Sequence, residues 1–398
     1  MKLLRLLLLA IILIYPGLSA MTIAQPPLPS ANAFRLAGQH FQNAQQQLNY
    51  VAPLQALLSH KAQLEPNMYA QTLATHFSFV GQLPAQTTKA LPAAYQTLPL
   101  DSLLLARAQA TSMVIINEAH DQPAHRAYCR QLLPQLARLG YSLLAVEALN
   151  PSDTAFNQRQ YPVATSGYYT CEPAMGNLLR AAAEQGYYVF GHEIRVDQEK
   201  ELADFNKRQQ YRDSLQAVNM LAVLRQHPGA KVVALVGYDH LAEKERSGIK
   251  RFATYLRELG QVDPLTIDQT SDYRLPASAT RPMVLATAGK VPTVSGEYAG
   301  QVDLQVLHPP LTRVQGRPRW LAASMGTKAL VQPIPARYVG TACLVQLYDQ
   351  GEYTRQGDKA IPLDQYLTNA TQKQVYLFPF ASGRAVVVKY RPAKLPKG

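Results

Sequence analysis

The stretch "SMVIINEAHDQPAHRAYCRQLLPQLARLGYSLLAVE" (residues 112–147) decides the fold class. It opens with a short apolar, β-branched run (112–117), continues with helical spacing of apolar residues over 123–140, and closes with a second apolar run (141–147). The helical part begins with proline and ends with glycine, which are common start and stop signals of a helix. The stretch therefore predicts a strand, a helix and a second strand in direct succession.

The same alternation continues as far as residue 268. Further helices are predicted over 173–186, 198–229 and 247–260, and further strands over 187–193, 230–241 and 263–268. Strands that alternate with helices form a parallel sheet, and strands that are apolar throughout are covered on both faces. The predicted fold class is α/β: a central, mainly parallel sheet flanked by helices, with an N-terminal helical segment and a smaller β-rich or mixed C-terminal region.

Composition divides the chain into four segments: a signal peptide (1–24), a linker and N-terminal helical region (25–100), the α/β domain (101–270) and a basic, β-rich C-terminal region (271–398). The first segment has two basic residues, a short apolar run and small residues at its end, which is typical of a secretory signal peptide. No cysteine lies near the cleavage site, and no later run is long enough to span a membrane. We therefore expect a secreted or periplasmic protein.

Net charge and cysteine content suggest little about partners. The net charge is +12, and residues 272–398 hold 16 Lys and Arg against 7 Asp and Glu. Such a region can bind an anionic polymer of the cell envelope or simply be a basic solvated surface. Nucleic acid is not an expected partner of a secreted chain. The cysteines Cys129, Cys171 and Cys343 allow one disulfide, and Cys129–Cys171 is the nearest pair in sequence.

Histidines and acids follow the predicted strands. In an open α/β sheet, ligands bind outside the carboxyl ends of the strands, so residues placed there are candidates for a functional site. Four of the nine histidines fall at or just past three strand ends, each with a carboxylate nearby. The candidates are Glu118, His120 and His125 after the first strand, Glu147 after the second, His192 after the third, and Tyr238 and His240 after the fourth.

These residue types suit two kinds of chemistry. Imidazoles and carboxylates bind divalent metals such as Zn, Mn, Co or Fe, and they also perform general acid–base catalysis on a water molecule. The residue types alone do not separate a metal site from a metal-free one. If a metal is bound, the expected ligands are Glu118, His120, His192 and His240.

Four segments resemble a known superfamily. In order and spacing, "NEAHDQPAHR" (117–126), "AVEAL" (145–149), "RDSLQAVNMLAVL" (212–224) and "VVALVGYDHL" (232–241) are similar to the superfamily of ChaN proteins, erythromycin esterases and TraB/Tiki proteins. The resemblance covers about residues 105–268 and is closest in motif to ChaN. Asn117 stands where the family has glycine, and asparagine tolerates left-handed backbone geometry better than most residues.

The resemblance implies a Glu/His pocket above a parallel sheet, with functions that differ between branches. Esterase relatives hydrolyse a macrolide lactone with a His–Glu pair, Tiki-like relatives are metal-dependent proteases, and ChaN relatives bind haem iron. We expect a hydrolase that cleaves an ester or amide bond in a small molecule or peptide. Its catalytic residues would be Glu118, His120, Glu147, Arg212 and His240.

In the expected mechanism, His120 or a bound metal activates water, the two glutamates orient or deprotonate it, and Arg212 stabilises the developing negative charge. Two alternatives stay open. The first is a protein that binds haem or iron without turnover, with Tyr238 and His125 as cofactor-binding residues. The second is a non-catalytic envelope protein that binds an anionic polymer through its basic C-terminal region.

Overall fold

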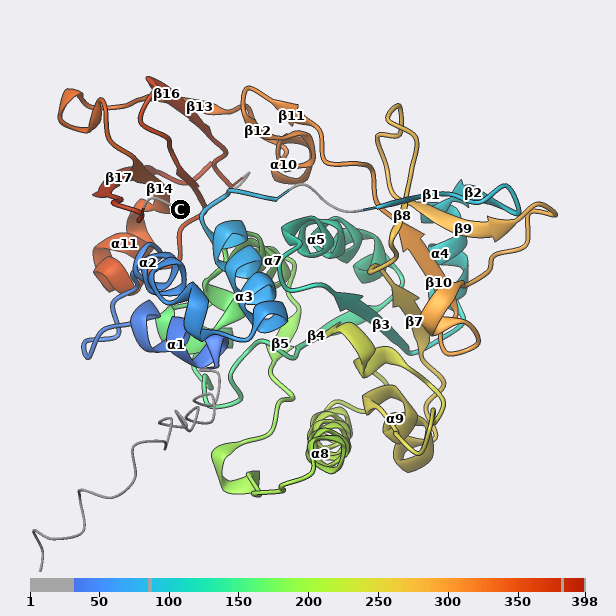
Figure 1. Cartoon of the computed structure of the whole chain (residues 1–398). Coiled ribbons are helices and arrows are strands. Elements are labelled where there is room, and N and C mark those ends of the chain that lie inside the picture. Colours follow the sequence, from blue (N-terminus) through green and yellow to red (C-terminus); the bar gives the residue numbers. More distant parts are fainter. Residues whose placement is uncertain (1–31, 85–87, 381–382, 397–398) are drawn as a thin grey trace, which may run out of the picture.

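The structure is a computed structural model that describes residues 32–84, 88–380 and 383–396. The predicted signal peptide lies outside the described residues. The central element is an eight-stranded sheet with the order β2-β9-β10-β7-β3-β6-β4-β5 (Figure 1). Its strands are β2 (Tyr95–Pro99), β3 (Met113–Glu118), β4 (Tyr141–Val146), β5 (Tyr188–Phe190), β6 (Lys231–Gly237), β7 (Leu265–Asp268), β9 (Met283–Thr287) and β10 (Leu304–Leu307).

The sheet is mainly parallel, so the predicted fold class is confirmed. The six strands from β10 to β5 run parallel, while β9 is antiparallel to both β10 and β2. Helices cover both faces: α4 (Leu100–Gln109), α5 (Pro123–Arg138) and α7 (Pro173–Glu184) on one, and α8 (Phe205–Gln226) and α9 (Phe252–Gly260) on the other (Figure 1).

The strand sequences explain why both faces are covered. Successive side chains of a strand point to opposite faces. In β3, Val114 and Ile116 pack into the core that α4, α5 and α7 share, while Met113 and Ile115 pack into the core beneath α8 and α9. All four side chains are at most 1% exposed. A strand that is apolar at every position therefore serves two cores at once.

The structure differs from the sequence prediction around residues 187–205. The predicted strand 187–193 is shortened to β5, and the predicted helix 198–229 begins only at α8. Asp204 caps α8, because its side chain accepts a hydrogen bond from the backbone N–H of Lys207 (2.7 Å). The charged segment before it forms a loop with one short 3₁₀ turn, Val196–Gln198.

The sheet also extends beyond the predicted α/β boundaries of 101–270. Strand β2 comes from the segment before it, and β9 and β10 come from the segment after it. The strands β2 and β9 carry the antiparallel edge, and each is only five residues long. Strand β2 lies in the segment that was expected to be helical, and no α-helix separates β9 from β10, so neither place gives the alternating strand–helix signal.

Two smaller layers complete the molecule. The N-terminal helices are α1 (Ala33–Phe41), α2 (Ala52–Ser59) and α3 (Pro66–Phe79). The C-terminal region contains the three-stranded antiparallel sheet β15 (Asp364–Leu367), β14 (Cys343–Asp349) and β17 (Val386–Pro392), the pair β13 (Leu330–Pro333) and β16 (Gln374–Leu377), and helices α10 (Arg319–Met325) and α11 (Gln350–Gln356). The two layers share a core, in which Phe41 and Leu54 join Leu344 and Leu367 (Figure 1).

The remaining elements are short. They are the pairs β1 (Lys89–Ala90) with β8 (Tyr273–Arg274) and β11 (Arg313–Val314) with β12 (Arg317–Pro318), and the helix α6 (Phe156–Arg159). No helix in the described part of the chain is long and apolar enough to cross a membrane.

The disulfide that the sequence allows, Cys129–Cys171, does not form. Cys129, Cys171 and Cys343 are all free and buried. Cys129 lies in the core between α5 and the large sheet, whereas Cys171 lies in the core that the N-terminal helices share with the C-terminal sheet. The two thiols therefore belong to different hydrophobic clusters, which proximity in sequence did not reveal.

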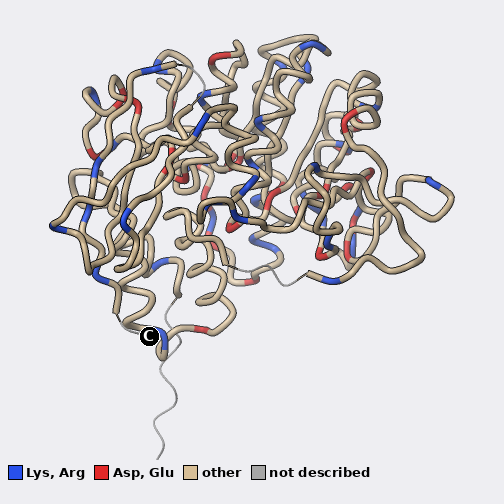
Figure 2. The backbone as a smooth tube through the Cα atoms, turned by 90° about the horizontal axis from the view of Figure 1, so that it is seen from above, with Lys and Arg blue, Asp and Glu red and all other residues tan. Residues whose placement is uncertain are grey.

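Basic residues are not concentrated on one surface. Figure 2 shows Lys and Arg spread over the molecule and interleaved with Asp and Glu. Within the C-terminal region, Arg317 pairs with Asp364 (2.6 Å), and Arg391 pairs with Asp358. Part of the excess positive charge counted in the sequence is therefore neutralised locally, which weakens the case for an anionic polymer as partner.

Candidate functional site

The carboxyl ends of three neighbouring strands bring the predicted site residues together. Strand β6 lies between β3 and β4, and Glu118 at the end of β3 is in register with Gly237 at the end of β6. On the other side of β6, the backbone N–H of Glu147 donates to the carbonyl oxygen of Leu235 (3.1 Å). Glu118, Glu147 and the 237–240 turn therefore meet at one edge of the sheet.

A buried ion-pair network holds Glu118. Arg126, on α5, donates through Nε and Nη2 to both carboxylate oxygens, with an Nη2–Oε1 distance of 2.8 Å. Its Nη1 donates to Glu172, the N-cap of α7 (3.1 Å). Glu118, Arg126 and Glu172 are 2%, 0% and 3% exposed. Burial alone would raise the pKa of Glu118, but Arg126 and His120 hold that pKa below its usual range, so the carboxylate is ionised.

Glu118 in turn orients His120. The Nδ1 atom of His120 lies 3.2 Å from Oε1 of Glu118, and the imidazole stacks on the ring of Tyr169 with centroids 4.2 Å apart. The ring of Tyr238 approaches edge-on at 5.3 Å. The side chain of His120 is 23% exposed, and among the described residues Nε2 has no hydrogen-bond partner. The imidazole is thus fixed at one nitrogen and free at the other.

Gly237 makes room for this arrangement. A Cβ atom at this position would lie 2.8 Å from Cε1 and 3.2 Å from Nε2 of His120, and 3.4 Å from Oε2 of Glu147. The free nitrogen of His120 and the carboxylate of Glu147 therefore border the same small space. The N–H of Gly237 also donates to Oε2 of Glu147 (2.6 Å). A side chain at this position would displace the imidazole of His120.

Arg212 is held between two carboxylates. Its Nε lies 3.0 and 3.1 Å from the oxygens of Glu193, and its Nη2 donates to both Glu193 and Glu147. Burial alone would raise the pKa of Glu147, but His240 and Arg212 lower it strongly, so this carboxylate is also ionised. Nη1 lies 3.1 Å from Nε2 of His240. A protonated His240 cannot accept from Nη1, so in that state the Nη1–H groups remain able to donate to a bound group.

A second acid–histidine pair completes the site. Nδ1 of His240 lies 2.5 Å from Oδ1 of Asp213, which is fully buried. Nε2 lies 3.1 Å from Nη1 of Arg212 and 3.4 Å from Oε1 of Glu147. Burial would lower the pKa of His240, but the two carboxylates outweigh it and raise the pKa above its ordinary value. His240 therefore favours the protonated state more than an unperturbed imidazole does.

Two predicted residues lie beside the site without joining it. Nδ1 of His125 accepts the backbone N–H of Ala119 (3.1 Å), and its ring packs against His308 with centroids 4.8 Å apart. The buried ring of His192 stacks on Phe252 (4.9 Å), and neither of its nitrogens has a hydrogen-bond partner in the described chain. Burial lowers the pKa of His125, and it lowers that of His192 to about 4, so both are neutral.

The residues do not fit the expected metal site. Within the described residues, no group of three or more His, Cys, Asp and Glu side chains is placed to hold a metal ion. Arg126 occupies both oxygens of Glu118, and both nitrogens of His240 lie within hydrogen-bond distance of Asp213 or Arg212. Metal ligands need free lone pairs. Of the four expected ligands, Glu118 and His240 have committed theirs to neighbouring protein groups, and only His120 and His192 keep a ring nitrogen that is free within the described chain.

The proposed haem ligands also face different places. Tyr238 lies beside His120, whereas His125 packs against His308. Two nearby tyrosines are engaged elsewhere: the hydroxyl of Tyr168 lies 2.6 Å from Nε2 of His76, and that of Tyr161 accepts from Arg355 (3.1 Å). These four side chains do not form one cofactor cradle.

Asn117 does not serve as a substitute for a left-handed glycine. It lies within β3 and is not among the residues with positive φ. Its side chain instead links three strand ends: Nδ2 donates to the carbonyl of Tyr238 (3.1 Å) and to Asp268 (2.9 Å), and Oδ1 accepts the N–H of Gln269 (2.7 Å). Tyr238, whose φ is 20°, is therefore held in an unfavourable conformation by hydrogen bonds from a neighbouring strand.

Sequence reasoning missed two residues of this site. Arg126 was quoted within a motif but given no role, and Glu172 lies at the end of the 150–172 segment, which was expected to be a loop. One signal was available for Arg126, because a charged residue on the apolar side of a helix requires a buried partner. Tyr169 was expected only as one of several tyrosines that suit the haem-binding alternative. Its stacking on His120 gave no sequence signal, since its position depends on packing against Phe34 and Phe79 of the N-terminal helices.

Comparisons with known proteins add little. No family model and no curated protein sequence matches the chain. Three solved structures are similar at low level: the type III effector HopBA1 (12% identity, 55% of this chain and 100% of that one, TM-score 0.36), ChaN of Campylobacter jejuni with cofacial haem (11%, 53% and 92%, 0.35), and RRSP, a MARTX toxin effector domain from Vibrio vulnificus CMCP6 (13%, 65% and 67%, 0.34). These likenesses are too distant to assign a function, so the chemistry must be argued from the site itself.

Proposed function

We propose that this protein hydrolyses an ester or amide bond, with His120 as general base. The observation that carries the proposal is the fixed His120: Glu118 holds Nδ1, while Nε2 has no partner among the described residues and borders the carboxylate of Glu147. A histidine oriented by a buried carboxylate, with its second nitrogen free, is the arrangement by which proteins activate a hydroxyl or a water molecule.

The reaction follows from these positions. Nε2 of His120 takes a proton from a water molecule beside Glu147, and the resulting hydroxide attacks the carbonyl carbon of the substrate. The oxyanion of the tetrahedral intermediate is stabilised by protonated His240 and by the free Nη1–H of Arg212. The bond to the leaving group then breaks, and His120 returns its proton to the departing oxygen or nitrogen.

The proposed substrate enters from the side of Arg212. This residue and Tyr211 line an open pocket of about 1030 Å³ between α8 and the 194–203 segment. The pocket wall carries Lys200 and Arg208 together with Glu199 and Glu201. Arg212 is already paired with Glu147 and Glu193, and the other charges of the wall are two of each sign. We therefore propose that the substrate is neutral or zwitterionic near the scissile bond. The signal peptide predicted at residues 1–24 would place the reaction outside the cytoplasm.

Hydrolysis fits the site better than haem binding does. A haem ligand must present a free donor atom to an open space, whereas His125 is buried with Nδ1 in use. Tyr238 and His125 also do not face a common space. The paired carboxylates and histidines, by contrast, are already positioned for proton transfer.

A substrate panel tests the proposal. Chromogenic esters, lactones and peptide anilides are incubated with the wild-type protein, His120→Asn and the exposed control His40→Asn. We expect turnover of at least one class by the wild type and by the control, and none above background by His120→Asn. Turnover should survive dialysis against a chelator, because the mechanism uses no metal. Equal activity in His120→Asn would refute the assigned base, and activity that requires added metal would refute the metal-free route.

The pH dependence tests the role of His240. Since this residue acts as a cation, kcat/KM should fall as the pH rises through its raised pKa. Asp213→Asn removes one of the two carboxylates that raise this pKa, so the alkaline limb of the profile should move to lower pH. The measurement is the pH profile of kcat/KM for both proteins on one substrate. An alkaline limb that stays in place would show that His240 is not the group responsible.

A further inference from the structure

A second pocket lies on the other side of α5 from the Glu118–Arg126 network. It is about 580 Å³ in volume and is enclosed by one stripe of α5, the 279–282 and 308–312 connections, and α10. The stripe follows helical spacing, with Ala124, Tyr128, Gln131 and Gln135 on it. This volume is within the range of sites for small organic ligands.

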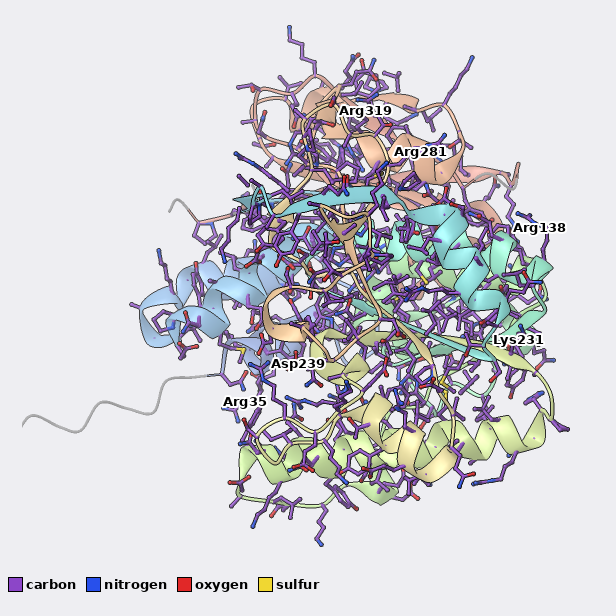
Figure 3. The ribbon with its side chains drawn as sticks, turned by 90° about the vertical axis from the view of Figure 1, so that its right-hand side faces the viewer. Arg35, Arg138, Lys231, Asp239, Arg281 and Arg319 are labelled. Carbon is purple, nitrogen blue, oxygen red and sulfur yellow. The ribbon has the colours of Figure 1, made fainter. Side chains whose placement is uncertain are left out.

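Two arginines in this pocket have no ionic partner. Arg281 lies in the connection before β9, and Arg319 is the first residue of α10. Figure 3 shows them on the same side of the molecule. Both side chains are exposed, and neither makes a hydrogen bond or ion pair within the described residues. By contrast, Arg317, which lines a neighbouring pocket, pairs with Asp364 (2.6 Å). Two unpaired guanidinium groups facing one space favour an anion.

A buried hydroxyl in the same pocket also lacks a partner. Tyr128 is 5% exposed, and its Oη has no hydrogen-bond partner in the described structure. Burial raises the pKa of this phenol, so it stays protonated and can donate. A buried, unsatisfied donor costs about 1–3 kcal/mol, which an acceptor entering the pocket would recover.

The other walls indicate the rest of the ligand. Trp320 and three prolines, Pro282, Pro309 and Pro310, supply apolar surface beside the polar groups. Asp101 also lines the pocket, so its charge and those of the two arginines leave one net positive charge. His308 adds none, because burial lowers its pKa to about 4. One net positive charge suits a monoanion better than a phosphate dianion.

We propose that this pocket, defined by Tyr128, Arg281, Arg319 and Trp320 and called here the two-arginine pocket, binds an organic carboxylate with an apolar, aromatic or branched body. The carboxylate lies between the arginines and accepts the hydroxyl of Tyr128, and the apolar body packs on Trp320 and the prolines. This site is separate from the Glu/His site, and the proposal does not depend on the hydrolase function.

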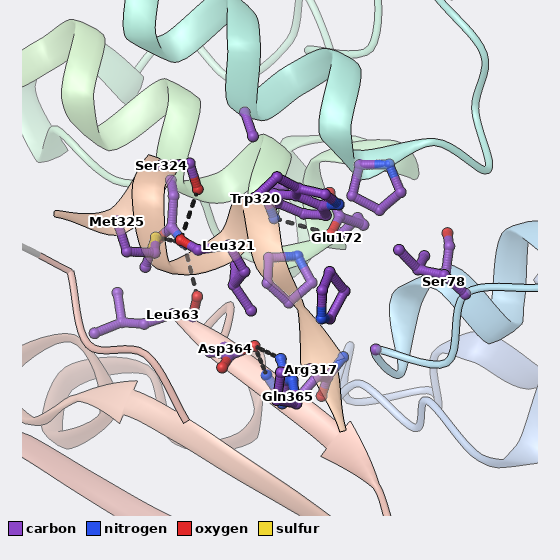
Figure 4. Close-up of a pocket in the computed structure, with 18 of the residues that line it drawn as sticks. Ser78, Glu172, Arg317, Trp320, Leu321, Ser324, Met325, Leu363, Asp364 and Gln365 are labelled. Atoms are coloured by element: carbon purple, nitrogen blue, oxygen red, sulfur yellow. Dashed lines mark hydrogen bonds and ion pairs between the residues drawn. The ribbon is translucent and has the colours of Figure 1, made fainter. Parts of the chain in front are cut away.

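A neighbouring pocket is much smaller than the two-arginine pocket. It has a volume of about 40 Å³ and lies between α7 and the C-terminal region, with Trp320 also in its wall (Figure 4). Its carboxylates are already committed: Glu172 accepts from Arg126 (3.1 Å), and Asp364 accepts from Arg317 (2.6 Å). Arg130 also lines this pocket, where its guanidinium stacks on Phe380. The small volume leaves a ligand little room, so the larger two-arginine pocket is the better candidate for a binding site.

The fluorescence of Trp320 can be used to test ligand binding in the two-arginine pocket. Trp320 is the only tryptophan in the sequence, so a change in tryptophan emission reports directly on the two-arginine pocket. The probe is 4-phenylbutyrate, and its neutral analogue 4-phenylbutanamide has the same apolar body without the charge. We expect a saturable change in emission with the carboxylate and binding at least about tenfold weaker with the amide, since a hydrogen bond to a charged group contributes about 1.5–3 kcal/mol.

Variants separate specific binding from general attraction. Arg281→Ala and Arg319→Ala should each weaken 4-phenylbutyrate binding about tenfold, measured by calorimetry because the second change adjoins the reporter. Tyr128→Phe should weaken it about fivefold without lowering the unfolding temperature, since the hydroxyl has no partner to lose. Arg138→Ala, which removes the same charge from an exposed position on α5 (Figure 3), should have no effect. Equal binding of the amide, or unchanged affinity in the Arg281, Arg319 or Tyr128 variant, would overturn the proposal.

Discussion

Arg126→Met is expected to lower the free energy of unfolding by about 3–5 kcal/mol. The methionine keeps much of the side-chain volume but removes the only cation between Glu118 and Glu172, which are 2% and 3% exposed. Two carboxylates would then be buried without a positive partner. Each would either stay charged without compensation for its lost hydration, or take up a proton. Denaturant unfolding followed by circular dichroism measures the loss directly.

Arg130→Met is the matched control. It makes the same chemical change one turn further along α5, where the guanidinium only stacks on Phe380 (5.4 Å), and it should cost about 1 kcal/mol or less. A triple variant, Arg126→Met with Glu118→Gln and Glu172→Gln, should recover at least about half of the loss, because it removes the unpaired charges. If Arg126→Met cost no more than Arg130→Met, the ion-pair network would contribute nothing to stability.

The large sheet could be predicted because its signal is local. Strands β3, β4 and β6 are mostly apolar, and each is followed or preceded by a helix with its own start and stop signals. Their order in the sheet could not be predicted from succession along the chain, because β6 lies between β3 and β4. The edge strands β2 and β9 could not be predicted in the same way, because their membership depends on hydrogen bonds between residues about 190 positions apart.

The candidate site, too, could be predicted from the sequence only in part. Glu118, Glu147 and His240 could be found because they directly follow apolar strands, and the carboxyl ends of parallel strands share one edge. The hydrogen bonds and ion pairs of these side chains could not be predicted. That Arg126 occupies both oxygens of Glu118, or that Arg212 lies between Glu147 and Glu193, depends on helix positions relative to the sheet. Those contacts are what changes the interpretation of the same residues from metal ligands to a hydrogen-bonded acid–histidine site.

His120→Asn is expected to lower kcat/KM by about 10²–10⁴ on any substrate that the wild type hydrolyses. Glu118→Gln should lower it by about 10², because the amide keeps the shape of the side chain but no longer holds His120 with a charge. Both effects should fall on kcat rather than KM, since neither side chain is expected to bind the substrate in the ground state. Glu352→Gln is the control: it neutralises a glutamate that is equally buried and arginine-paired, but far from any histidine of the site.

The double variant decides whether Glu118 acts through His120. If Glu118 only positions the imidazole, it has nothing left to position once His120 is replaced, and the double variant should be no slower than His120→Asn within about threefold. If Glu118 instead contacts the substrate or the water by itself, the two losses should multiply. If Glu118 had a merely structural role, the two losses of kcat/KM would also multiply, because damage to the fold does not depend on the identity of residue 120. Non-additivity is therefore the one result that places Glu118 and His120 in a single catalytic unit, and its absence would remove the basis for treating this strand end as an active site.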